Sequence, residues 1–312
     1  MVFGVAESHT WGVMATGPEL IANFMSGDEP VAAWARRREE EGWPVLGCAD
    51  HLWSGDRAFP HVWVTLATMA AATQKCLLTS SFANNLFRSP VEFAQASLQM
   101  QQVSGGRFEA GLGAGWSEDE AVGGGFGYPS PGVRARRYAE AIHIVKALLA
   151  YQRVEFDGDH YTVSVPRLGP APTRDCPPPP LVASLGGDYT IRTIAPLVDR
   201  VELKLISAAT RAGSLDVAAM AQIPSSHLDD LIAKVRVVNP AVPLGVFLLC
   251  SVGDDARTRA MEKALAGSFL GGFFGSPDKV ADSIRALRTR GISRAQISPF
   301  TEASFELLAE RF

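Results

Sequence analysis

The sequence is short of cysteine and lysine, and it has no long hydrophobic run. The longest apolar stretches, residues 63–73 and 244–250, fall well below the roughly 20 residues that cross a bilayer, so a membrane protein is excluded. The four cysteines include no CxxC pair, and three of them lie in or beside apolar runs. We therefore expect buried, reduced thiols at most of these positions, which are Cys48, Cys76, Cys176 and Cys250.

Charge is also limited, and no basic cluster is present. Lysine and arginine number 29 against 33 aspartates and glutamates, for a net charge of −4. Without a basic patch, nucleic acid is not an expected partner. Residues 1–5 read as a strand and lack the charged and apolar regions of a secretory signal, so we expect a cytoplasmic location.

What the chain does have is enough apolar material for a large core. Of 312 residues, 47% are hydrophobic and 20% are charged, which is typical of a folded globular protein. The length suits two ordinary domains or one α/β barrel of about 250 residues with insertions. We find no linker and no internal repeat, so residues 1–312 are predicted to form a single domain.

Apolar, β-rich runs alternate with helical patterns along the chain. The eight strand candidates are residues 2–6, 44–49, 77–82, 108–112, 181–185, 201–206, 244–250 and 295–298. Helices are clearest at residues 29–41, 91–103, 133–151 and 276–290, the last ending at Gly291. Continuous apolar strands separated by helices indicate a parallel sheet covered on both faces. Eight such units predict a closed (β/α)8 barrel, with a doubly wound open sheet as the alternative.

Two segments are longer than ordinary connections and are predicted to be insertions. Residues 7–28 follow the first expected strand and contain His9 and Trp11, which we expect in a lid or substrate wall. Residues 156–180 precede the fifth strand and are predicted to form a hairpin or extended excursion followed by a proline spacer.

Candidate chemistry lies just after the strands, where a parallel barrel places its reactive groups. Asp50 and His51 follow the second strand, and a histidine there can exchange a proton near neutral pH. A capping aspartate beside a packed histidine is the equally supported alternative. Glycine-rich turns follow the fourth and fifth strands, and their backbone amides could approach an anion or a flat ring. His61, His143 and His227 have no ligand spacing, and no metal site is predicted.

Taken in order, these motifs resemble those of the luciferase-like flavin and deazaflavin oxidoreductases over nearly the whole chain. The matching segments are ADHLW at 49–53, FRSP at 87–90, SGGRFEAGLGAGW at 104–116, RARRYAEAIHIVKALL at 134–149, FDGDHYTV at 156–163, PLVASLGG at 180–187 and FGSPDKVADSIRAL at 274–287. The Asp-His pair and the GAGW turn are most similar to the branch that uses coenzyme F420, a hydride-carrying deazaflavin. FMN remains the alternative cofactor.

The resemblance implies roles for particular residues. It makes His51 the proton donor or acceptor over the deazaflavin, supported by Asp50, and it places a non-proline cis peptide at Ser81–Phe82. It implies cofactor contacts at Asp50, Ser81, Phe82, Ala83, Ala114, Gly115, Gly186 and Gly187, and substrate contacts at His9, Trp11, Trp53 and Trp116. Members that oxidise sugar phosphates carry glutamate at the position of Trp116, so the substrate does not carry over.

The leading hypothesis is therefore an F420-dependent oxidoreductase that moves a hydride to or from a small substrate with a C=C, C=N or alcohol/carbonyl group. The alternative enzyme is a monooxygenase that uses reduced FMN. The third hypothesis is a protein that binds a cofactor without catalysing a reaction. A homodimer is expected from the family.

Overall fold

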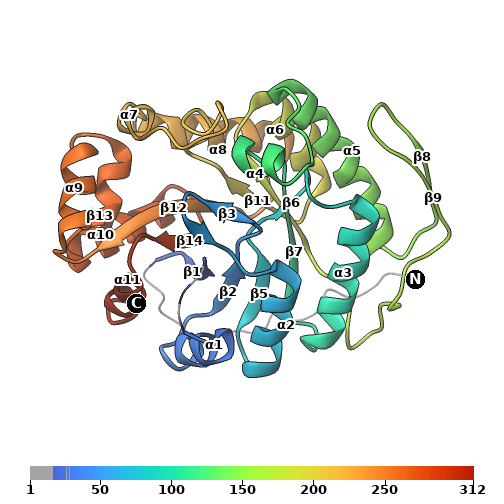
Figure 1. Ribbon diagram of the computed structural model, residues 1–312, viewed down its shortest axis with the longest axis horizontal. Coiled ribbons are helices and arrows are strands. Elements are labelled where there is room, and N and C mark those ends of the chain that lie inside the picture. Colours follow the sequence, from blue (N-terminus) through green and yellow to red (C-terminus); the bar gives the residue numbers. More distant parts are fainter. Residues whose placement is uncertain (1–16, 26, 28) are drawn as a thin grey trace.

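The computed structural model describes residues 17–25, 27 and 29–312, and its centre is a closed barrel of eight parallel strands. Strand β10 pairs with both β7 and β11, which closes the sheet. The barrel strands appear at the middle of Figure 1, surrounded by helices. They are β1 (Glu19–Phe24), β2 (Val45–Cys48), β5 (Leu77–Ser80), β7 (Phe108–Gly113), β10 (Leu181–Leu185), β11 (Arg200–Leu203), β12 (Leu244–Val252) and β14 (Arg294–Pro299). The predicted (β/α)8 barrel is confirmed.

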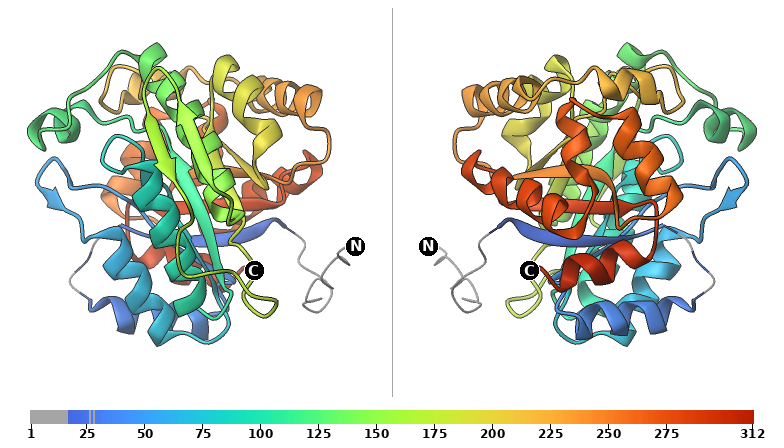
Figure 2. Two further views of the ribbon diagram at one scale, coloured as in Figure 1. Left: turned by 90° about the vertical axis from the view of Figure 1, so that its right-hand side faces the viewer. Right: turned by 90° about the vertical axis from the view of Figure 1, so that its left-hand side faces the viewer.

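Helices follow the strands and cover the outside of the barrel, as the two side views of Figure 2 show. Three of the longer ones begin with the pair Ser-Pro, in which proline occupies the first turn, where its missing N–H costs no hydrogen bond. The helices are α1 (Val31–Glu40), α2 (Val62–Ala72), α3 (Pro90–Val103), α4 (Glu118–Gly123), α5 (Pro131–Leu149), α6 (Asp188–Ile194), α7 (Val217–Ala221), α8 (Ser226–Val238), α9 (Ala256–Ala264), α10 (Pro277–Thr289) and α11 (Ala303–Ala309). No helix of the described residues is long and apolar enough to span a membrane.

The first barrel strand is not where the sequence placed it. The strand that pairs with both β14 and β2 is β1, inside the segment predicted to be an insertion after strand 1, whereas residues 2–6 lie outside the described part. The strand was missed because its apolar run, residues 20–22, is short and is flanked by Glu19 and Asn23. Leu20, Ala22 and Phe24 pack in the core, while Glu19 and Asn23 bond to residues of β14. The connection from β1 to α1 is consequently short, and that insertion is withdrawn.

The predicted excursion before the fifth strand is present. It begins with an antiparallel hairpin of β8 (Val154–Asp157) and β9 (Thr162–Val165), which lies outside α5 at the right of Figure 1. The carboxylate of Glu140 on α5 accepts hydrogen bonds from the backbone amides of three turn residues, Asp159, His160 and Tyr161. The remaining short strands are β3 (Trp53–Ser54), β4 (Arg57–Ala58), β6 (Ala83–Asn84) and β13 (Phe274–Gly275).

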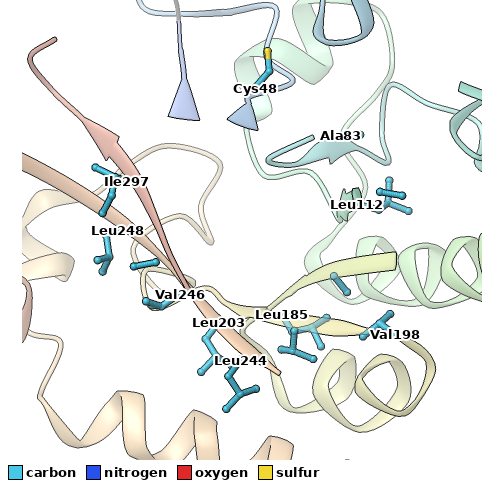
Figure 3. Packing of buried hydrophobic residues seen from close by; sticks show 14 of the residues in the cluster. Cys48, Ala83, Leu112, Leu185, Val198, Leu203, Leu244, Val246, Leu248 and Ile297 are labelled. Carbon is cyan, nitrogen blue, oxygen red and sulfur yellow. The ribbon is translucent and has the colours of Figure 1, made fainter. Parts of the chain in front are cut away.

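The hydrophobic core lies between the barrel wall and the helices. Figure 3 shows part of it, including Leu203 of β11, Leu244 and Val246 of β12 and Ile297 of β14. Intervening positions carry polar side chains such as Glu202, Gln296 and Ser298, which are also buried. Since side chains alternate between the two faces of a strand, the apolar set covers the outside and the polar set fills the inside. Three cysteines, Cys48, Cys76 and Cys250, are buried free thiols as expected, and Cys176 is only partly buried.

Candidate active site

A cavity of about 1380 Å³ lies at the carboxyl ends of the barrel strands. Residues at or near the carboxyl ends of the strands line it, for example Asn23 near the end of β1, Asp50 after β2 and Lys204 after β11. This is the end of a parallel barrel that carries active sites. The cavity brings together ten residues singled out from the sequence: Asp50, His51, Ser81, Phe82, Ala83, Ala114, Gly115, Trp116, Gly186 and Gly187.

His51 is held by a carboxylate that sequence reasoning missed. Its Nδ1 lies 2.7 Å from Oε2 of Glu120 on α4, and Oε1 of the same carboxylate accepts the backbone amide of Leu52 at 2.6 Å. Burial alone would raise the pKa of Glu120, but the hydrogen bond and charge of His51 and the Leu52 amide outweigh it, so the pKa is lowered. Glu120 is therefore ionised near neutral pH and accepts a hydrogen bond from Nδ1–H of His51. Nε2 remains as the nitrogen for proton exchange.

Aromatic rings complete the surroundings of His51. Its ring meets the indole of Trp116 nearly edge-on, with centroids 5.7 Å apart, and the ring of Phe59 with centroids 5.3 Å apart. The Nζ atom of Lys204 lies 5.4 Å from the centroid of the Trp116 indole. Trp116 thus contacts both the imidazole of His51 and the ammonium group of Lys204.

Asp50, which the resemblance places in support of His51, is hydrogen-bonded to other residues. Its oxygens accept from Nη2 of Arg88 at 2.9 Å, from Nε of Arg88 at 3.2 Å and from the Asn84 amide at 2.9 Å. Because Arg88 lies just before α3 and Asn84 in β6, this buried ion pair anchors the chain that follows β5. Asp50 lines the cavity, but Glu120 is the carboxylate bonded to His51.

The segment after β5 forms one wall of the cavity and contains the cis peptide expected at Ser81–Phe82. Its neighbour β7 approaches it very closely at Gly111. Oγ of Ser80 donates to the Gly111 carbonyl and accepts from the Gly111 amide, at 2.8 and 3.0 Å. A Cβ at position 111 would lie 1.9 Å from the carbonyl oxygen of Ser80, so only glycine fits there.

A second wall is formed by the turn at Gly186 and Gly187 after β10. A Cβ at Gly186 would lie 1.8 Å from Oγ of Ser207 and 2.8 Å from the carbonyl oxygen of Lys204. The glycine therefore lets the turns after β10 and β11 pack together. Gly187 is less crowded, because its nearest neighbour, Oγ1 of Thr190, would be 3.7 Å away.

The predicted substrate residues are only partly brought together. Trp116 lines the cavity, whereas Trp53 is not among the lining residues and lies against Gly123 of α4. His9 and Trp11 lie outside the described residues. No local pattern marks Glu120 as a site residue, and its spacing from Ser117 is only that of a helix capping box. Its contact with His51 joins residues 69 positions apart.

The chemistry of the wall fits a large ring with an anionic tail. The cations that line the cavity outnumber the carboxylates, which are Asp50, Asp56 and Asp188. Asp50 is paired with Arg88 and Asp188 with Lys234. The cations are Arg57, Arg134, Lys204, Arg211 and Arg257. Within the described residues, no group of three or more His, Cys, Asp or Glu side chains could hold a metal ion.

Comparisons with known proteins agree with this geometry. The chain is 34% identical over 159 residues to the F420-dependent glucose-6-phosphate dehydrogenase of Beutenbergia cavernae, covering 49% of this chain and 46% of that one. It spans about half the length of the curated relatives it matches.

Two solved structures have the same fold at low identity. An F420-dependent secondary alcohol dehydrogenase in complex with an F420–acetone adduct has a TM-score of 0.70 at 16% identity, covering 95% of this chain and 98% of that one. The monooxygenase RslO1 from Streptomyces bottropensis also has a TM-score of 0.70, at 18% identity, covering 94% and 98%. The profile of the luciferase-like monooxygenases matches residues 25–222, well over half of the sequence, and the protein belongs to that family.

Proposed function

We propose that the protein is an F420-dependent oxidoreductase that transfers a hydride between the deazaflavin and a small organic substrate. The observation that carries the proposal is His51, held by an ionised Glu120 on the wall of a large cavity built from glycine turns. The relatives whose names include F420 support the choice of cofactor.

The residues that would hold the cofactor belong to the turns and segments at the carboxyl ends of β5, β7 and β10. The segment Ser81 to Ala83 and the turn at Ala114 and Gly115 would contact the ring, and the backbone at Gly186 and Gly187 would approach the tail. The arginines of the cavity wall would offset the charge of the phosphate and glutamates in that tail. When bound, a deazaflavin supplies or accepts a hydride and does not readily activate oxygen.

His51 moves the proton that accompanies the hydride. Glu120 fixes the tautomer by accepting from Nδ1–H, so Nε2 is the basic nitrogen when an alcohol is oxidised and the donor, once protonated, when a double bond is reduced. The rings of Trp116 and Phe59 pack beside the imidazole.

The second candidate is an FMN-dependent monooxygenase, favoured by the fold shared with RslO1. The deciding experiment titrates the purified protein with oxidised and reduced F420 and FMN, and follows the spectrum of each bound ring as candidate substrates are added. We expect tight F420 binding and substrate-dependent spectral change without oxygen uptake. Tight FMN binding with oxygen-dependent turnover and no F420 binding would overturn the proposal. F420 binding without any spectral change on addition of substrates would indicate a carrier rather than an enzyme.

A further inference from the structure

Lys204 is a cation for which the structure provides no carboxylate. It is the first residue after β11, it lines the cavity, and it is only partly exposed. No ion pair or side-chain hydrogen bond involves its ammonium group in the described part of the chain, and the ammonium lies over the Trp116 indole. A half-buried ammonium has three N–H donors. Leaving them without acceptors costs free energy in the folded protein unless a ligand accepts hydrogen bonds from them.

The carboxylates of the cavity wall are engaged elsewhere or not joined to Lys204. Asp50 is bonded to Arg88, Asp188 is bonded to Lys234, and no ion pair connects Asp56 to the lysine. Glu120 is bonded to His51. The nearby cation Arg134 donates to the carbonyl of Pro129 and stacks on Tyr128, with its guanidinium 4.0 Å from the ring centroid.

Burial and the charge of Arg134 lower the pKa of Lys204 to about 8. The group is therefore mostly protonated at neutral pH, and an anion placed beside it would raise the pKa again. Both effects arise inside the cavity.

Lys204 and His51 both lie next to Trp116 in the cavity. The indole of Trp116 contacts Lys204 and His51 at once, so Nζ and the imidazole are no further apart than the sum of two short contacts, 5.4 and 5.7 Å. Both groups therefore lie beside one side chain of the cavity wall.

We propose that the substrate of this enzyme carries a carboxylate, which binds the ammonium of Lys204 while the reacting carbon lies along Trp116 towards His51. One free ammonium beside an already engaged arginine matches a single negative charge, which favours a carboxylate over a phosphate dianion. This inference rests on the proposed function, because it assumes that His51 marks the reacting end.

The test follows Lys204 directly by NMR of protein labelled with ¹³Cε-lysine. The chain has only six lysines, so the spectrum is simple, and the Lys204 signal is identified by its loss in Lys204→Met. The holoenzyme with oxidised F420, and the protein without it, are titrated with acetate, with neutral acetamide and with inorganic phosphate. We expect acetate to shift the Lys204 signal saturably and to raise its pKa, with an affinity at least about tenfold above that of acetamide.

Cofactor binding is measured separately so that the two proposals can fail independently. Lys204→Met should leave the Kd for F420 within about twofold, and the exposed control Lys146→Met should change neither Kd nor the acetate response. The inference is overturned if acetate leaves the Lys204 signal unmoved, or if phosphate binds there more tightly than acetate. It is also overturned if F420 itself shifts the signal and blocks acetate. Failure of F420 to bind would instead count against the proposed function, while the acetate titration of the cofactor-free protein still reports on Lys204.

Discussion

Both ends of the barrel interior contain charged side chains. At the amino end the charges form ion pairs with each other, whereas at the carboxyl end one cation has no carboxylate partner among the described residues. At the amino end, Nε of Arg294 donates to Glu19 at 2.6 Å, and the same guanidinium is bonded to Glu109 across the barrel. Glu202 and Arg200 belong to the same cluster. At the carboxyl end, glycine turns open the wall and Lys204 has no carboxylate within the described residues. Charges that neutralise each other stabilise the fold, and charges left over are available to a ligand.

The largest effect is expected at the carboxyl end. His51→Ala should reduce turnover by about 10²- to 10⁴-fold, because it removes the group that exchanges the proton. The Kd for the cofactor should change little. Steady-state rates and a cofactor titration check both, with the exposed His143→Ala as control. Unchanged turnover would show that His51 only packs against Trp116.

The matching change at the amino end should affect stability instead of turnover. Arg294→Met leaves the carboxylates of Glu19 and Glu109 without their partner in the barrel interior, which typically costs about 3–5 kcal/mol. Urea unfolding measures the loss, and turnover per folded molecule should be retained. If turnover fell with little loss of stability, the two ends would not be independent.

A smaller effect is expected for the carboxylate that orients His51. Glu120→Gln keeps the shape but removes the charge that fixes the tautomer, and should lower turnover by about 10- to 100-fold. The pH profile of kcat should also shift, because the imidazolium loses its counter-charge. An unaltered profile with reduced turnover would assign Glu120 to the packing of α4 alone.

The last change concerns Glu202 and depends on pH. Burial raises its pKa to about 8, so the folded protein keeps this carboxyl protonated where the unfolded chain has lost the proton. This contribution to stability is fully present below a pH of about 4.5 and is lost as the pH rises towards 8, at up to about 1.4 kcal/mol per pH unit. Glu202→Gln should therefore gain stability relative to the wild type across that window. Parallel stability curves for the two proteins would contradict the raised pKa.

Sequence patterns predicted the barrel well because most of its strands lie in β-rich runs that are mainly apolar. The exception, β1, includes Glu19 and Asn23, whose partners on β14 are some 275 residues away, so nothing local marks them as buried. The glycine turns and His51 could be found because turns after strands have recognisable residues. Glu120 could not, since its contact with His51 depends on how α4 folds over the cavity.

Lys204 was overlooked for a different reason. The apolar run at residues 201–206 includes it, whereas β11 ends at Leu203 and leaves Lys204 as the first residue beyond the strand. A strand end placed three residues earlier would have put the lysine among the candidates.

The tight packing around Gly111 bears on attempts to alter the protein by directed evolution. Any side chain at position 111 would collide with the backbone of Ser80, so a library that randomises it would yield misfolded proteins rather than new specificities. Gly187 has a φ of −120°, a value open to other residues, and the space beside it admits a methyl group. Alanine at position 187 is therefore a practical first step for narrowing the pocket while keeping the barrel intact.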